Sequence, residues 1–185
     1  PEASINMDIT NDEAKSKAEG FLANRGIDIG EFMHAKRFGY ERESKIFLEY
    51  HLSAEEAGEI LNNTNGYYWR NRWFKPKHKE EVKVYYSTRG ALRTFIHQIP
   101  EDASGDSLTQ GNALNAAQFF LVGTIGIDIQ DWELIESKTE KLKNRWDHEF
   151  EWKEKSFNIK ESNHILTVKV QGDKIGYYNE RIKVP

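Results

Sequence analysis

The sequence predicts an α+β fold of two repeated units. Each unit has one helix packed on an antiparallel sheet of about four strands, and the first carries an extra helical insertion. Two observations predict this fold. A helix-like segment occurs twice, and each copy precedes short segments in which apolar and polar residues alternate, as they do in half-buried strands.

The repeat begins with a threonine and continues through small and apolar residues at helical spacing. The matching positions are Thr10, Ala14, Ala18, Phe21 and Leu22 in the first copy, and Thr109, Ala113, Ala117, Phe120 and Leu121 in the second. Gly-Ile-Asp-Ile follows both, at residues 26–29 and 126–129, so the second copy has one additional residue near the helix end. Such self-similarity indicates a duplicated unit.

Residues 1–8 are predicted to form a linker. The first helix begins after Thr10, because Thr10 and Glu13 have the spacing of a capping box, in which each side chain binds a backbone N–H group. Its apolar residues share one face, and Gly26 suits a left-handed helix end.

A strand is expected at residues 32–40, followed by the helical insertion at about 43–63. Ser53 and Glu56 fit a second capping box, so the insertion is predicted to break near Leu52 into two helices. Further strands are expected at 67–74, 81–87 and 91–99, which completes a first unit of residues 9–102.

Residues 103–106 are predicted as a linker, and residues 107–185 as the second unit. Its helix, residues 109–124, is apolar over most of its circumference, so we expect it to lie between the two units. Its strands are expected at 132–137, 146–152, 164–170 and 175–184.

Composition excludes several function classes. Lys and Arg number 26 against 30 Asp and Glu, a net charge of −4, which argues against a general nucleic-acid binder. The absence of cysteine excludes disulfides, thiolate metal sites and cysteine nucleophiles. No apolar run is long enough to span a membrane, and no signal peptide is visible. Because the chain begins at Pro1 and ends at Pro185, we expect a segment of a longer or processed protein.

No catalytic motif is present. None of the six histidines has the spacing of a helical zinc site, and nucleophile elbows and phosphate loops are missing. His148 lies among Trp146, Phe150 and Trp152, which favours a hydrogen-bonded core histidine, and His51 is expected on an exposed helix surface. We therefore predict no catalytic residue, no metal site and no cofactor.

Basic and aromatic residues interleave in one predicted strand and the turn after it. The candidate binding residues there are Trp69, Arg70, Arg72, Trp73 and Lys75. Strand alternation places the two tryptophans on one face and the two arginines on the other. The leading interpretation is a core face and a solvated face. An anionic or peptide ligand is the second, and single-stranded nucleic acid is weighed and not predicted.

The corresponding strand of the second unit carries Asp147, Glu149 and Glu151 on its polar face. Opposite charges on matching strands suggest complementary packing between the units or between chains.

The chain resembles PepSY-like, cystatin-like domains and, over nearly its whole length, the extracytoplasmic N-terminal region of bacterial intramembrane metalloproteases of the CAAX-protease and bacteriocin-processing family. The stretches that carry the resemblance are residues 11–14, 21–22, 68–76, 98–103, 131–135 and 168–173. The proteolytic Glu and His motifs of that family lie in membrane helices and have no counterpart here.

The resemblance implies a non-catalytic regulatory or binding module on the periplasmic or cell-surface side, tethered through its parent chain to a membrane protease domain. A cytoplasmic location stays open. The expected partner is a peptide or protein, which a sheet edge can bind by strand addition. The alternative is a freestanding enzyme or small-ligand-binding protein with a site between the two units. A deep polar cleft with converging Glu and His would favour that alternative.

Overall fold

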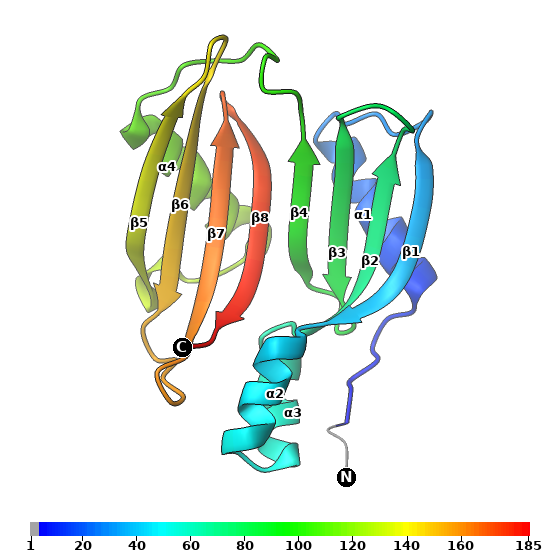
Figure 1. Cartoon of the computed structure of the whole chain (residues 1–185), viewed down its shortest axis with the longest axis vertical. Coiled ribbons are helices and arrows are strands. Elements are labelled where there is room, and N and C mark those ends of the chain that lie inside the picture. Colours follow the sequence, from blue (N-terminus) through cyan, green and yellow to red (C-terminus); the bar gives the residue numbers. More distant parts are fainter. Residues whose placement is uncertain (1–3) are drawn as a thin grey trace.

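The computed structural model describes residues 4–185, so the first three residues of the predicted N-terminal linker lie outside it. The described part contains four α-helices and one antiparallel sheet of eight strands (Figure 1). The helices are α1 (Asn11–Asn24), α2 (Arg42–His51), α3 (Ala54–Asn63) and α4 (Gln110–Phe120). The strands are β1 (Met33–Tyr40), β2 (Tyr67–Phe74), β3 (Glu81–Ser87), β4 (Leu92–Gln98), β5 (Trp132–Lys141), β6 (Trp146–Glu154), β7 (Asn163–Gln171) and β8 (Lys174–Lys183).

The expected pair of four-stranded sheets is a single sheet, with the order β1-β2-β3-β4-β8-β7-β6-β5. Its halves join where β4 pairs with β8, through the residue pairs Thr94–Asn179, Phe95–Tyr178 and Ile96–Tyr177. The sequence did not predict this union, because each strand alone has the alternation of any half-buried strand.

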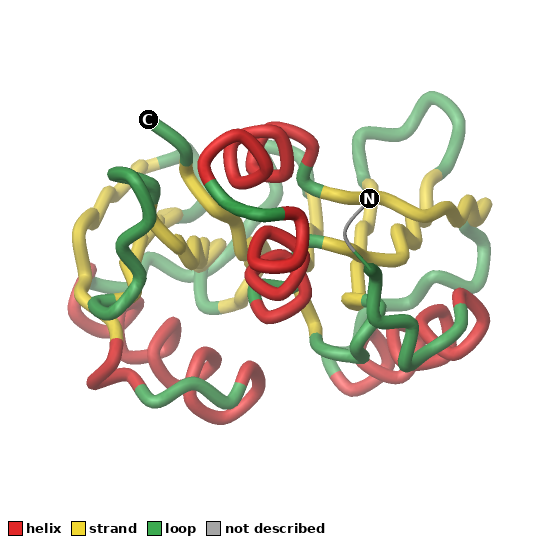
Figure 2. The backbone as a smooth tube through the Cα atoms, turned by 90° about the horizontal axis from the view of Figure 1, so that it is seen from below, coloured by secondary structure: helices red, strands yellow, loops and turns green. Residues whose placement is uncertain are grey.

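Helices α1 and α4 pack on the same face of the sheet, one over each half (Figure 2). The apolar core between the helices and the sheet is continuous across both halves. It includes Leu22, Trp73 and Phe95 from the first half, and Phe120, Trp152 and Tyr178 from the second. We call the other face of the sheet, which faces the reader in Figure 1, the open face.

The expected position of the second helix between the units is wrong. α4 packs mainly on β6, β7 and β8. Its Phe119 and the following Val122 are exposed, at 82% and 49%. Its apolar character therefore reflects side chains that remain accessible on the helix layer.

The predicted helix signals are confirmed. Thr10 and Ser53 form capping boxes with Glu13 and Glu56, and Gly26 adopts a left-handed conformation with a φ of 69°. At the end of α4, residues Leu121–Ile125 form a π-helix, at the place where the sequence has its additional residue. A single insertion produces this wider turn, and π-turns are frequent at functional sites.

The insertion helices α2 and α3 brace the seam between the halves. Leu48, Ala57 and Leu61 form a second apolar cluster with Tyr67 of the first half and Ile182 of the second. The two helices therefore connect strands from both halves at one end of the sheet.

A buried ion pair strengthens the same end. Arg93 of β4 donates to the Glu41 carboxylate, which also accepts from the backbone N–H of Ile182 at 3.2 Å. The Arg93 guanidinium lies over the Tyr68 ring, 4.1 Å from its centroid, and donates to Asn179 at 3.2 Å. A buried guanidinium needs such partners, because unpaired burial of a charge is costly.

Candidate functional site

The predicted binding residues do not form one site. Arg70 and Arg72 lie on the open face, where they line a groove. Trp73 is 3% exposed and belongs to the core on the helix side, while the Trp69 indole N–H donates to the Ile9 carbonyl at 3.1 Å. Lys75 lies 3.6 Å from the Glu31 carboxylate, beyond the strand end. The predicted alternation of faces is thus confirmed, and it separates the arginines from the tryptophans.

The expected packing of oppositely charged strands against each other between the units is wrong. Both strands belong to the same sheet and carry these charges on the same open face, with β3, β4, β8 and β7 between them. Arg72 pairs instead with Glu81 on the adjacent strand, and Glu151 pairs with Arg181 at 2.7 Å.

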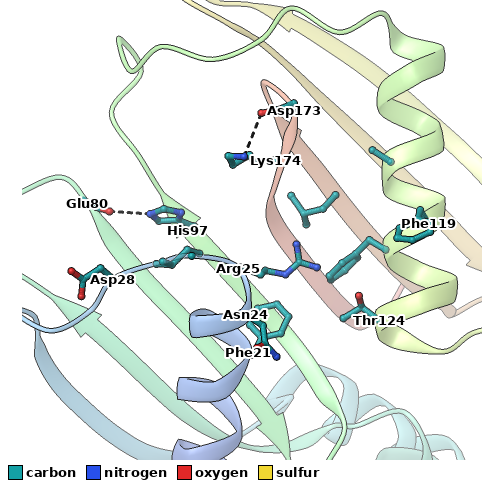
Figure 3. A pocket seen from close by; sticks show the side chains of 15 residues that line it. Phe21, Asn24, Arg25, Asp28, Glu80, His97, Phe119, Thr124, Asp173 and Lys174 are labelled. Atoms are coloured by element: carbon teal, nitrogen blue, oxygen red, sulfur yellow. Dashed lines mark hydrogen bonds and ion pairs between the residues drawn. The ribbon is translucent and has the colours of Figure 1, made fainter.

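A cleft of about 930 Å³ lies on the helix side, between α1 and the α4–π-helix segment (Figure 3). We call it the interhelical cleft. It includes the ends of β4 and β8 beyond Ile96 and Tyr177, where the pairing of these strands stops. Its apolar surface comes from Phe21, Ile27, Ala116, Phe119, Phe120 and Ile175.

Arg25 points into this cleft (Figure 3). Its guanidinium lies between two aromatic rings, 5.0 Å from the centroid of Phe21 and 4.9 Å from that of Phe120. Within residues 4–185, no carboxylate lies within ion-pair distance of it. Burial lowers the pKa of the Arg25 guanidinium from its ordinary value, but such a group stays charged at any physiological pH. Aromatic contacts therefore hold a guanidinium that has no direct ion-pair partner among the described residues, in a cleft that the carboxylates of Asp28, Glu80 and Asp173 also line.

Polar groups surround the remaining rim. His97 and Glu80 are hydrogen-bonded, with 3.0 Å between Nε2 and Oε1, and Lys174 lies 3.8 Å from Asp173 (Figure 3). Thr124 is the hydroxyl-bearing residue in the lining of the cleft, and it lies across the cleft from His97 in Figure 3. A histidine activates a nucleophile only within hydrogen-bond reach, so this geometry provides no acyl-transfer dyad.

A second cavity, of about 360 Å³, shares Phe21 and Thr124 with the interhelical cleft. It continues toward Leu92, Tyr178 and Glu180, along the seam of the sheet. The two cavities are therefore neighbours, with Phe21 and Thr124 in the lining of both.

The open face has a smaller groove of about 470 Å³ over β1, β2 and β3. Arg37, Arg70, Arg72 and Lys83 line it together with Glu81 and Tyr85. We call it the basic groove. It includes both arginines that the sequence singled out.

The structure places the other predicted candidates as follows. His148 is buried. Its Nδ1 shares a hydrogen bond with Thr139 Oγ1 at 2.9 Å, and its Nε2 donates to the Leu108 carbonyl at 2.8 Å. The predicted hydrogen-bonded core histidine is thus confirmed. His51 is exposed on α2, as expected.

One group of carboxylates in the described residues has metal-ligand spacing, namely Glu136, Glu149 and Glu151 on the open face. Each already has a cationic partner, in Lys138, Lys169 and Arg181 respectively. Cationic side chains of the same sheet thus neutralise the negative charge of these three carboxylates.

Sequence reasoning missed Arg25, Glu80 and His97. Arg25 is the C-cap residue of α1 and precedes the left-handed Gly26, which is a local signal for a helix end. The Phe120 ring that contacts Arg25 lies in the other half. No pattern within either copy could have indicated this contact.

Comparison of the chain with protein-family models, with curated proteins and with solved structures finds no match. Among residues 4–185, no helix combines the length and the apolar character needed to cross a membrane.

Proposed function

We propose that the chain is a non-catalytic binding module that holds a peptide segment of a partner protein in the interhelical cleft. The observation that carries the proposal is the Arg25 guanidinium, which has no ion-pair partner among the described residues, in a cleft that the exposed Phe119 ring also lines. A carboxylate would pair with Arg25, and an adjacent apolar side chain would cover Phe119. The preferred segment therefore has an acidic residue or a terminal carboxylate next to a large apolar residue.

We further propose that the two halves are PepSY-like repeats. Each consists of a helix followed by four strands in the same chain order, and the sheet order is symmetric about the β4–β8 seam. Gly26 and Gly126 occupy equivalent left-handed positions, with φ of 69° and 84°. A cleft at such a seam is shared by both repeats.

The resemblance described above supports an extracytoplasmic location and attachment to a membrane protease. In that setting the module would present a peptide to the protease or restrain it. This part of the proposal depends on the parent chain, so its test is whether hydrophobic helices with the family's Glu and His motifs follow Pro185 in the reading frame.

A second candidate function is binding of a small carboxylate ligand at the same site. The hydrogen-bonded Glu80–His97 pair at the cleft rim favours it, because it provides polar groups opposite Arg25. N-acetylphenylalanine, which combines a carboxylate with an aromatic ring, is a suitable probe. Saturable binding of this compound as tight as that of the best peptide would favour the small-ligand function.

The test of the peptide proposal is selection of short random peptides displayed on phage, followed by fluorescence polarisation with the enriched peptides. We expect Arg25→Gln and Phe119→Ala each to weaken binding about tenfold or more, since each removes a contact worth roughly 1–3 kcal/mol.

The chain offers matched controls. Tyr50 on α2 is 83% exposed, much like Phe119, and Arg42 lies at the start of the same helix, away from the cleft. Tyr50→Ala and Arg42→Gln should leave binding unchanged. Enriched peptides that bind all four variants equally would show that the cleft is not the binding site.

A further inference from the structure

The basic groove on the open face concentrates positive charge on an acidic chain. Three arginines and two lysines, Lys36 and Lys83, line it with the single carboxylate of Glu81, whereas the whole chain has a net charge of −4. Lys36 pairs with Asp12 of α1. The groove and the interhelical cleft lie on opposite faces of the sheet. A ligand of the groove is therefore separate from the proposed peptide.

Arg70 is held in a fixed position in this groove. Its guanidinium lies 5.4 Å from the ring centroid of Tyr68 and 6.0 Å from that of Tyr85. A Cβ atom on Gly39 would lie 2.4 Å from the Arg70 Nε, so only glycine leaves room for the arginine against β1. The rigid placement means that little side-chain entropy remains to be lost on binding.

The hydrogen bonds of Arg70 are incomplete. Its Nη2 donates to the Tyr68 hydroxyl at 3.3 Å, but its Nε is buried and has no acceptor within residues 4–185. A buried donor without a partner destabilises the folded chain by roughly 1–3 kcal/mol. An anion in the groove would therefore contact Arg70 at its Nη groups, because the buried Nε lies against Gly39 of β1.

The neighbouring cations are only partly compensated. Arg72 donates to Glu81 through Nη2 at 3.2 Å, and Lys83 lies 3.4 Å from the same carboxylate. Arg37, on the edge strand β1, makes no ion pair with any described residue. One carboxylate thus serves two cations, while Arg37 and Arg70 have none.

We propose that the basic groove binds a phosphoryl group. A phosphoryl group carries about −1.5 to −2 charges and three acceptor oxygens, which match the surplus of cations and the guanidinium forks. A carboxylate carries one charge and would leave the surplus incompletely neutralised.

The experiment is titration of the whole chain with inorganic pyrophosphate, followed by the arginine side-chain N–H signals in NMR and by calorimetry, at constant ionic strength. We expect saturable binding with shifts of the Arg70 and Arg72 signals, and none with acetate. Arg70→Gln should reduce the affinity at least about tenfold, through loss of a charge-assisted hydrogen bond. Arg37→Gln, on an exposed edge position that the fold does not need, should also weaken binding.

Arg181→Gln is the matched control, because Arg181 lies on the same open face but pairs with Glu151. It should bind pyrophosphate as the unchanged chain does. Vesicles of phosphatidylcholine with and without phosphatidic acid distinguish the two sources of a phosphoryl group. Vesicle binding that needs phosphatidic acid and is reversed by pyrophosphate identifies a lipid headgroup, and pyrophosphate binding alone identifies a soluble compound.

The proposal is overturned if pyrophosphate shows no saturable binding, if acetate binds equally well, or if Arg70→Gln and Arg37→Gln both leave the affinity unchanged. None of these outcomes bears on the peptide proposal, which is tested at Arg25 and Phe119.

Discussion

His164 is an ionisable side chain that its neighbours hold in the charged form. It is 6% exposed, and its two ring nitrogens contact carboxylates, Nδ1 with Glu154 at 2.7 Å and Nε2 with Glu180 at 2.8 Å. Burial alone would lower the pKa of His164, but the hydrogen bonds to these carboxylates outweigh burial and raise its pKa to about 9. The same hydrogen bond lowers the pKa of Glu154.

The stability of the chain should therefore fall as the pH rises from about 6.5 to above 9. The folded-state pKa of His164 exceeds its ordinary value of 6.5, so its contribution is complete below pH 6.5 and is lost as the pH passes about 9. This contribution is at most roughly 3 kcal/mol. Urea unfolding across this pH range measures it, and His164→Gln should flatten the profile.

His97→Gln is the control, because the His97–Glu80 pair lies at the cleft rim, where solvent reaches it. This variant should show the same decrease in the free energy of unfolding with rising pH as the unchanged chain. If the free energy of unfolding of His164→Gln depends on pH as that of the unchanged chain does, His164 is not the source of the pH dependence. The sequence could not indicate this site, since Glu154 and Glu180 reach His164 only through the register of three strands.

At the scale of single elements, local sequence patterns were sufficient to predict the helices and strands. The capping boxes, the break between α2 and α3 and the strand alternation all depend on residues close in sequence, and the structure confirms them. The main error in bounds is at β5, which continues to Lys141. The added residues are polar and exposed on an edge strand, so they lack the apolar alternation that predicts a strand.

The caps of the two long helices provide a direct comparison. Thr10 and Glu13 form a reciprocal capping box, whereas Thr109 accepts from the Asn112 N–H without a returning carboxylate. Thr10→Ala should lower the free energy of unfolding by about 1 kcal/mol, and Thr109→Ala by less. Chemical denaturation measures both. An equal or larger effect at Thr109 would show that the Glu13 carboxylate adds nothing.

At the scale of the whole molecule, sequence reasoning reached the class of the fold but not its assembly. The expected helices and strands exist, yet the union of β4 with β8 and the contact of α2 and α3 with Ile182 depend on residues far apart in sequence. The same limit applies to the candidate sites. Arg70 and Arg72 were found from their strand, whereas the interhelical cleft depends on how the halves meet.

The Arg93–Glu41 pair is the buried electrostatic contact at this meeting point. Arg93→Met or Glu41→Gln alone should destabilise the chain by roughly 3–5 kcal/mol, because each leaves a buried polar group without its partner. The double variant should cost clearly less than the sum of the two. Urea unfolding of the four proteins measures the coupling.

Exposed Lys15 and Glu19 on α1 provide the comparison pair. Their removal should cost no more than about 0.5 kcal/mol. Additive effects at Arg93 and Glu41 would mean that the two residues stabilise the seam independently.

The pairing of β4 with β8 has a mechanical consequence. It covers three residue pairs near the end that α2 and α3 support, and the interhelical cleft lies beyond its other end. The supported end would therefore act as the pivot for a rotation of one half against the other. Such a rotation would change the spacing of Phe21 and Phe120 more than that of Glu41 and Ile182, because the pairing of β4 with β8 stops before the cleft.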